Sequence, residues 1–184
     1  MGQTWFQKLF TPRPRPDPEN LRAQAAQGDA DAQFSLGVLC SVADGQGRDL
    51  AEAARWYRQA ADQNHPLAEF NLSLMFAEGE GVPQDDVAAL DWLRRAAEHG
   101  DAGAQYNLGT RCHRASLSGR DAGAAASRIE AYKWLRLAAL QDYKDAGVAC
   151  AGLSLVMSRE EIAEANSQAE SFAVARQSGI AKGP

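Results

Sequence analysis

The amino-acid sequence predicts an all-α protein of closely packed helices, and three observations lead to that fold class. Alanine accounts for 36 of the 184 residues, and it is both the strongest helix former and a small packing residue. β-Branched residues are scarce, which argues against an extensive sheet. The third observation is an internal repeat, which organises a chain whose length suits one domain with a hydrophobic interior.

The repeat is marked by three tryptophans, Trp56, Trp92 and Trp134, which are 36 and 42 residues apart. Each tryptophan is followed four and five residues later by a pair of alanines. Upstream of each tryptophan the same residue types recur in register, namely Ala32, Ala68 and Ala104, then Phe34, Phe70 and Tyr106, then Leu36, Leu72 and Leu108. Self-similarity at a fixed period indicates an array of repeated supersecondary units.

Each unit has the pattern of a helix, a turn and a second helix. In the middle unit, the apolar residues of 68–76 have helical spacing, and the sequence EGEGVP then interrupts the helix. Asp85 is suited to cap the second helix, and Gly100 to end it. The predicted units are 29–64, 65–100 and, with six extra residues in an inserted loop, 101–142.

The ends of the array predict capping elements, because a solenoid needs terminal units with one polar face. Residues 18–28 have the pattern of a second helix from an incomplete unit. Residues 143–177 predict a further first helix and then a capping helix, with a capping box from Ser158 to Glu161. Residues 178–184 are expected to form a flexible tail.

These positions resemble the Sel-1-like repeat, a relative of the tetratricopeptide repeat with a 36-residue period. The resemblance covers roughly residues 20–157 and implies a right-handed α–α superhelical solenoid of helix-turn-helix repeats. It also implies a non-catalytic adaptor or scaffold that binds other proteins. The middle unit matches the family pattern through Ala68, Leu72, Gly79, Gly81, Val82, Asp85, Ala89, Trp92, Ala96, Ala97 and Gly100.

Composition and charge exclude several classes of function. A net charge of −5 with only four lysines argues against nucleic-acid binding, which requires a basic face. No apolar run approaches the roughly 20 residues that span a bilayer, and the first residues lack the long apolar region of a secretory signal. The predicted location is therefore the cytoplasm, with a peripheral position at the inner membrane face as the alternative.

The sequence contains no recognisable catalytic or metal-binding pattern. Gly-x-Ser-x-Gly and Ser-x-x-Lys are absent, so we predict a non-enzyme with neither cofactor nor metal. An enzyme that recognises β-lactams is the alternative that the resemblance leaves open, and turnover of a chromogenic β-lactam tests it. Cys40, Cys112 and Cys150 are predicted to be buried free thiols. His65 and His99 are predicted to be surface histidines, and Arg94 and Arg95 to belong to a solvated face.

The first helices would line the concave groove of such a solenoid and bind a protein or peptide segment, as the likeness to tetratricopeptide domains implies. Aromatic side chains would supply flat apolar contacts, and asparagines would pair with the partner's backbone. The predicted partner-binding residues are Phe34, Phe70, Asn71, Leu74, Tyr106, Asn107, Thr110, His113 and Arg114. The alternative places the aromatic rings in the core between neighbouring first helices, in which case Phe70→Ala should cost roughly 3–5 kcal/mol.

Residues 1–17 predict a short amphipathic segment followed by a proline-rich linker. Within the sequence TWFQKLF of residues 4–10, four apolar side chains fall on one helical face, namely Trp5, Phe6, Leu9 and Phe10. Residues 1–16 carry a net side-chain charge of +3, which suits weak contact with a membrane surface or with a partner. A frayed tail and packing against the body are the alternatives. The chain is expected to be a monomer or a weak homo-oligomer.

Overall fold

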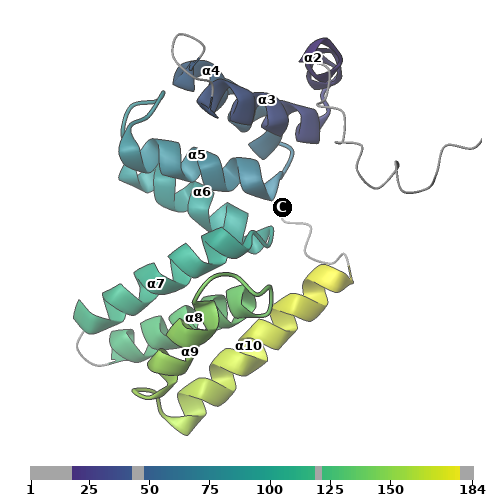
Figure 1. Cartoon of the computed structure of the whole chain (residues 1–184). Helices are drawn as coiled ribbons and strands as arrows, with labels where there is room; N and C mark the ends of the chain where they lie inside the picture. Colours follow the sequence, from purple (N-terminus) through teal and green to yellow (C-terminus); the bar gives the residue numbers. More distant parts are fainter. Residues whose placement is uncertain (1–17, 43–47, 119–121, 179–184) are drawn as a thin grey trace, which may run out of the picture.

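The computed structural model of the chain describes residues 18–42, 48–118 and 122–178. These residues form nine α-helices and no strand. The helices are α2 (Pro18–Ala26), α3 (Ala30–Val42), α4 (Leu50–Ala61), α5 (Pro66–Glu78), α6 (Asp86–Glu98), α7 (Ala102–Ser118), α8 (Ala122–Ala139), α9 (Ala146–Ser154) and α10 (Arg159–Gln177). Figure 1 shows them following one another in a bent array, with α2 at one end and α9 at the other. The predicted all-α solenoid is confirmed.

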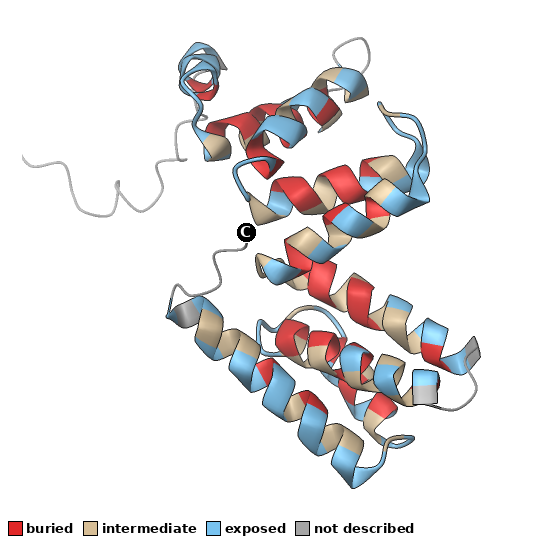
Figure 2. Cartoon of the chain, turned by 180° about the vertical axis from the view of Figure 1, so that it is seen from behind, coloured by how far each residue is buried: buried red, intermediate tan, exposed pale blue. Residues whose placement is uncertain are grey.

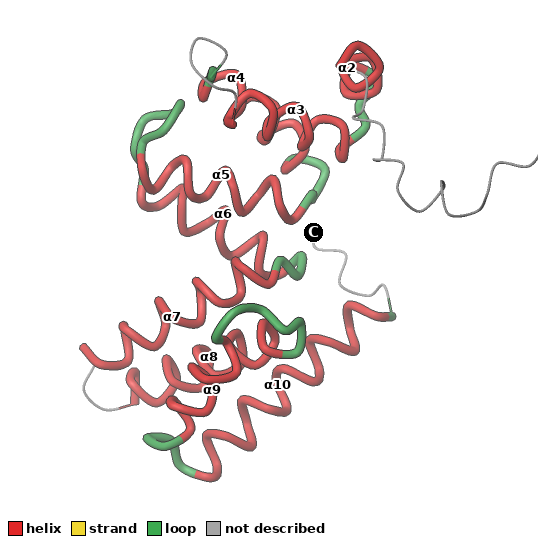
Figure 3. Tube along the Cα trace, viewed as in Figure 1, coloured by secondary structure: helices red, strands yellow, loops and turns green. Residues whose placement is uncertain are grey.

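Three helical hairpins build the array. The first helices α3, α5 and α7 pair with the second helices α4, α6 and α8, and short connections link one hairpin to the next (Figure 3). Buried residues face the interfaces between helices (Figure 2). The alanine pairs of the repeat are wholly buried at Ala60, Ala61, Ala96 and Ala97, because small side chains let neighbouring helices approach closely.

The turn and cap predicted for the middle unit are confirmed. Gly79 ends α5 with a φ of 70°, and Gly81 has a φ of 71°; both angles lie in the left-handed region that glycine adopts without strain. The Asp85 side chain accepts hydrogen bonds from the backbone N–H groups of Val87 and Ala88, each at 3.0 Å. These bonds satisfy donors that a helix start otherwise leaves without a partner.

The capping helix α10 does not pair with α9 in the manner of the other hairpins. Its capping box from Ser158 to Glu161 is present as predicted, but the helix makes its main contact with α8. The ring of Phe172 meets the edge of Trp134 with 5.4 Å between ring centroids. Farther along α10, the Arg176 guanidinium lies directly against Gly100. One side of α9 is therefore left without a partner helix.

All three cysteines are free, as predicted. Burial raises the pKa of Cys112 to about 11, and since the thiolate is the reactive form, on the order of one Cys112 in a thousand is reactive at pH 8. Both thiols are half-buried, but burial raises the pKa of Cys40 by less than that of Cys112. We therefore expect iodoacetamide at pH 8 to modify Cys40 well before Cys112.

Intact-mass spectrometry over the labelling time course measures this order. After denaturation all three thiols should react. Fewer than three modified thiols, or equal rates at Cys40 and Cys112 in the folded protein, would contradict the assignment.

Candidate functional site

The first helices expose apolar side chains, whereas the second helices expose mainly charged ones. Leu39 and Val42 on α3 are 48% and 66% exposed, and Leu67 and Leu74 on α5 are 48% and 41% exposed. The exposed residues of the second helices include Arg55, Arg58, Asp91, Arg94 and Glu98. Exposed apolar surface that is gathered on one side of a soluble protein marks an interaction site.

The three recurring aromatic residues lie half-buried where one first helix meets the start of the next. Phe34 stacks on His65 with ring centroids 4.7 Å apart, and Tyr106 lies 5.7 Å from Tyr143. A ring carbon of Phe70 would be 3.2 Å from a Cβ atom placed on Gly103. Val148 occupies the equivalent position on α9, where no first helix follows in the described chain, and it is 73% exposed.

Part of each aromatic ring therefore packs within the array, and part faces outward. This geometry is compatible with both roles considered for these residues. The core role gains support from Val148, because the residue at this position is largely exposed on the helix that no further first helix covers in the described chain.

The polar residues predicted on this face are partly engaged with the protein itself. The Asn71 side chain hydrogen-bonds the Tyr57 hydroxyl, and the Thr110 hydroxyl donates to the carbonyl of Tyr106 at 2.7 Å. Asn107 is half-buried, and the buried Nδ1 of His113 has no hydrogen-bond partner among the described residues.

Arg114 is exposed on the same helix as Asn107. All nine predicted residues thus lie on α3, α5 and α7. The four predicted contact residues between Trp5 and Phe10 lie outside the described residues.

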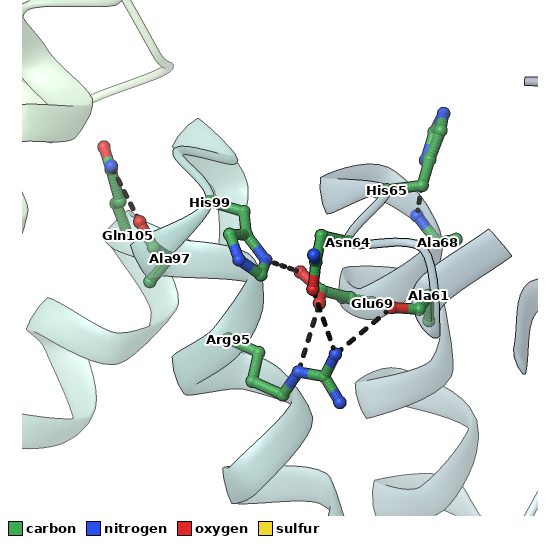
Figure 4. A network of polar contacts seen from close by, with 9 residues as sticks. All are labelled: Ala61, Asn64, His65, Ala68, Glu69, Arg95, Ala97, His99 and Gln105. Carbon is green, nitrogen blue, oxygen red and sulfur yellow. Dashed lines mark hydrogen bonds and ion pairs between the residues drawn. The ribbon is translucent and has the colours of Figure 1, made fainter. Parts of the chain in front are cut away.

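A buried charged cluster between α5 and α6 was not anticipated from the sequence (Figure 4). The Glu69 side chain is fully buried, and one carboxylate oxygen lies 2.7 Å from His99 Nδ1 while the other lies 3.2 Å from Arg95 Nε. Arg95 also donates to the carbonyl of Ala61 at 3.2 Å. The assignment of His99 to the surface was wrong, because its side chain is only 23% exposed and turns toward the buried carboxylate. Arg95 remains 40% exposed, as expected for a solvated face, and reaches the carboxylate from there.

The flanking repeats hold neutral amides at the positions of this cluster. Gln33 donates to the carbonyl of Ala25 at 3.1 Å and accepts from Gln63 at 2.8 Å. Gln105 donates to the carbonyl of Ala97 and accepts from Gln141 in the same way. The Glu69 side chain has no N–H group, so it cannot donate to the equivalent carbonyl, that of Ala61. Arg95 supplies that donor instead. In the aligned units, one position holds Gln33, Glu69 and Gln105, and the other holds Gln63, His99 and Gln141. The middle unit departs from glutamine at both positions, and this paired departure in the sequence could have revealed the cluster.

Burial raises the pKa of the Glu69 carboxyl, although His99 and Arg95 oppose that shift. The cluster joins the start of α5 to the end of α6, and its carboxylate is fully buried. We interpret it as a structural element rather than a reactive site.

Two surface hollows are lined by residues of the described chain. One, of about 550 Å³, is lined by Arg55, Arg58 and apolar residues of α4 and α5, and the other, of about 470 Å³, lies between α8 and α10 beside Arg176. Neither is lined by a histidine, cysteine, aspartate or glutamate, so neither offers an acid, base or nucleophile. Within the described ranges there is also no group of three or more potential metal ligands, and no helix has the length and apolarity needed to cross a membrane.

Comparison with known proteins gives consistent matches. A family model described as Sel1 repeat matches residues 30–65, 66–101 and 102–143. The crystal structure of a Sel1 repeat protein from Oxalobacter formigenes is similar with 34% sequence identity and a TM-score of 0.62, covering 73% of this chain and 96% of that one. The protective antigen c5321 of uropathogenic Escherichia coli strains, which displays an SLR fold, is similar at 22% identity and a TM-score of 0.57, covering 90% of this chain and 42% of that one. The search of curated proteins found no match.

Proposed function

Because the chain belongs to the Sel1 repeat family, we propose that it is a non-catalytic adaptor whose first-helix face binds a segment of another protein. Sel1 repeats are typically protein-interaction modules, and their solenoid is generally a non-catalytic scaffold. The specific surface and the kind of partner are the parts that we add. The partner would be an extended or helical segment with apolar side chains.

The exposed apolar residues of α3 and α5 carry this proposal. Leu67 and Leu74 are seven residues apart, two turns along α5, so they project on the same side of that helix. On α3, the exposed Val42 lies one helical turn beyond Val38, the residue in the position of Leu74, so it extends the apolar surface to that helix. A partner segment would bury these side chains, and each leucine contributes on the order of 1–2 kcal/mol when apolar surface of this extent leaves water.

The test compares a double variant on the proposed surface with a matched variant elsewhere. Leu67→Glu with Leu74→Glu should abolish capture of partners identified by mass spectrometry with the unchanged chain, and should leave thermal stability nearly intact because both side chains are exposed. Val87→Glu is the control, since Val87 is 72% exposed on the second helix α6. Equal capture by the double variant and the control would contradict the proposal.

The polar part of the surface has its own test. If Asn71 and Asn107 pair with a partner's backbone, Asn107→Ala should weaken binding without loss of stability, whereas Asn71→Ala also removes a hydrogen bond to Tyr57. Binding that is unchanged in a folded Asn107→Ala variant would limit recognition to the apolar residues. The cytoplasmic location, the weak membrane contact and the monomeric or weakly oligomeric state are proposals that rest on the sequence.

A further inference from the structure

The end of the array formed by α9 and the turn after it has an entirely apolar exposed surface. The exposed residues between Ala146 and Met157 are Gly147, Val148, Ala151, Gly152, Leu155 and Val156, and we call them the terminal face. None carries a charge or a polar side chain. Leu155 is 86% exposed, more than any other large hydrophobic residue in the described chain. A helix on the outside of a soluble protein normally presents polar residues there.

The repeat register explains why this surface is uncovered. Gly147 and Ala151 occupy the positions of Gln33 and Gly37. In the first hairpin, Gln33 accepts a hydrogen bond from Gln63 in the turn after α4, and Gly37 lies against Tyr57 of α4. At the end of the array no helix takes that place, because α10 packs mainly against α8. The terminal face is therefore an interface of the repeat whose partner helix is missing from the described chain.

Glycines on first helices elsewhere in this protein receive a large side chain from a neighbouring element. The ring of Tyr57 lies against Gly37, the ring of Phe70 against Gly103, and the side chain of Leu135 against Gly109. A Cβ atom added at Gly147 or at Gly152 would meet no atom within 4 Å. The fitting occupant of the terminal face thus brings several large apolar side chains.

We propose that the terminal face binds residues 4–10 of a second copy of this chain. That segment offers four large apolar side chains within seven residues, namely Trp5, Phe6, Leu9 and Phe10. The terminal face of a second copy offers only Val148, Leu155 and Val156 in addition to small residues, so it fills the glycine positions less well than aromatic side chains do. Charge also favours the N-terminal segment, because residues 1–16 carry +3 and residues 140–178 carry six acidic and three basic side chains, a net −3.

The length of the linker places the segment on another copy rather than on its own chain. Helices α2 and α9 lie at opposite ends of the array in both views (Figures 1 and 2). Seven residues, the length of the proline-rich linker 11–17, would span about 22 Å as an extended polyproline helix. The three steps between first helices from α3 to α9 already take about 24–30 Å, before α2 is added.

This contact joins two different surfaces, so copies associate head to tail and form open chains or a ring. Seven residues bury much less than the roughly 1,200 Å² of a stable interface. The association is therefore weak and depends on concentration. It involves neither the first-helix face of α3 and α5 nor its partner, so its success or failure is independent of the proposed adaptor function.

The test uses a fluorescent peptide of residues 1–16 and the chain without those residues. Fluorescence anisotropy should show saturable binding with a Kd of roughly 10–500 μM. Gly147→Gln with Leu155→Gln should weaken binding at least tenfold, and both residues are exposed, so the fold is retained. The control is Val174→Gln, which removes an apolar side chain that is 63% exposed on α10. A peptide with Trp5→Ser and Phe10→Ser should not bind even to the unchanged protein.

Sedimentation velocity of the full chain supplies the second measurement, with association that rises with concentration and disappears when residues 1–16 are deleted. Absence of peptide binding at 1 mM, or equal binding by the Gly147→Gln/Leu155→Gln variant and the control, would overturn the proposal. Association that persists without residues 1–16 would instead assign the terminal face to a contact between two α9 helices. Partition of the peptide into anionic vesicles without binding to the chain would assign the segment to membranes.

Discussion

Replacement of Glu69 by leucine is expected to destabilise the folded protein by roughly 3 kcal/mol. Leucine fills the fully buried site with an apolar side chain, but it removes the carboxylate that Arg95 and His99 contact at 3.2 and 2.7 Å. His99 then loses its hydrogen-bond partner and Arg95 its ion-pair partner, both in a half-buried interface. The Arg95 side chain is 40% exposed, so water can solvate it in the variant. The loss of stability should therefore stay below the largest losses that follow when one partner of a buried ion pair is removed. Equilibrium unfolding in urea at pH 7 measures the change.

The matched control is Glu69→Gln, which restores the residue found in the flanking repeats. A glutamine at position 69 can donate to the carbonyl of Ala61, as Gln33 and Gln105 donate to Ala25 and Ala97. We therefore expect a stability within about 1 kcal/mol of the original at pH 7. The double change Glu69→Gln with His99→Gln reproduces both flanking residues and should be at least as stable. Equal losses for leucine and glutamine would contradict this account of the cluster.

The pH dependence of these variants gives a further check with a defined sign. Because burial raises the pKa of Glu69 above its ordinary value of 4.5, the folded state holds a proton there that the unfolded chain releases. Between pH 4.5 and that raised pKa, the Glu69 contribution to stability falls as pH rises. Glu69→Gln removes this term, so its stability relative to the unchanged chain should increase from pH 4 to pH 7. A relative stability that stays constant over this range would contradict the raised pKa.

The features that follow from local sequence could be predicted, because each depends on residues close together in the chain. The caps at Asp85 and Ser158 and the glycine turn after α5 require only a few neighbouring residues, and the structure confirms them. The period itself follows from the recurrence of tryptophan at positions 56, 92 and 134, because each of these residues is followed by a pair of buried or half-buried alanines at a helix interface.

The features that were missed depend on contacts between elements far apart in the sequence. Arg95 and His99 have the local pattern of a surface helix, and only the buried Glu69, 26 and 30 residues earlier in the chain, brings them into one cluster. Likewise, the apolar stripe of α10 was predicted, with Ala169 and Phe172 buried or half-buried. The stripe does not specify whether it packs on α8 or on α9, and that choice exposes the terminal face.

The second large effect is expected at Gly37, where valine should destabilise the protein by about 3 kcal/mol or more. A Cβ atom at this position would lie 2.6 Å from two ring carbons of Tyr57. That ring cannot move aside easily, because Tyr57 is 3% exposed and its hydroxyl lies 3.2 Å from the hydroxyl of Ser41. The added side chain must therefore separate α3 from α4, at the interface on which the first hairpin depends.

The control for this prediction is a glycine in a helix with open space around it. Gly123 lies in the first turn of α8, and a Cβ atom there would meet nothing within 4 Å. Gly123→Ala should leave stability unchanged or raise it by up to about 1 kcal/mol, since alanine favours the helix. Gly37→Ala separates the two effects, because its helix preference opposes the clash with Tyr57. In urea unfolding, the free energy of unfolding of Gly123→Ala should equal or exceed that of the unchanged chain, Gly37→Ala should be less stable than the unchanged chain, and Gly37→Val the least stable. A Gly37→Ala variant as stable as Gly123→Ala would show that close packing does not require glycine at position 37.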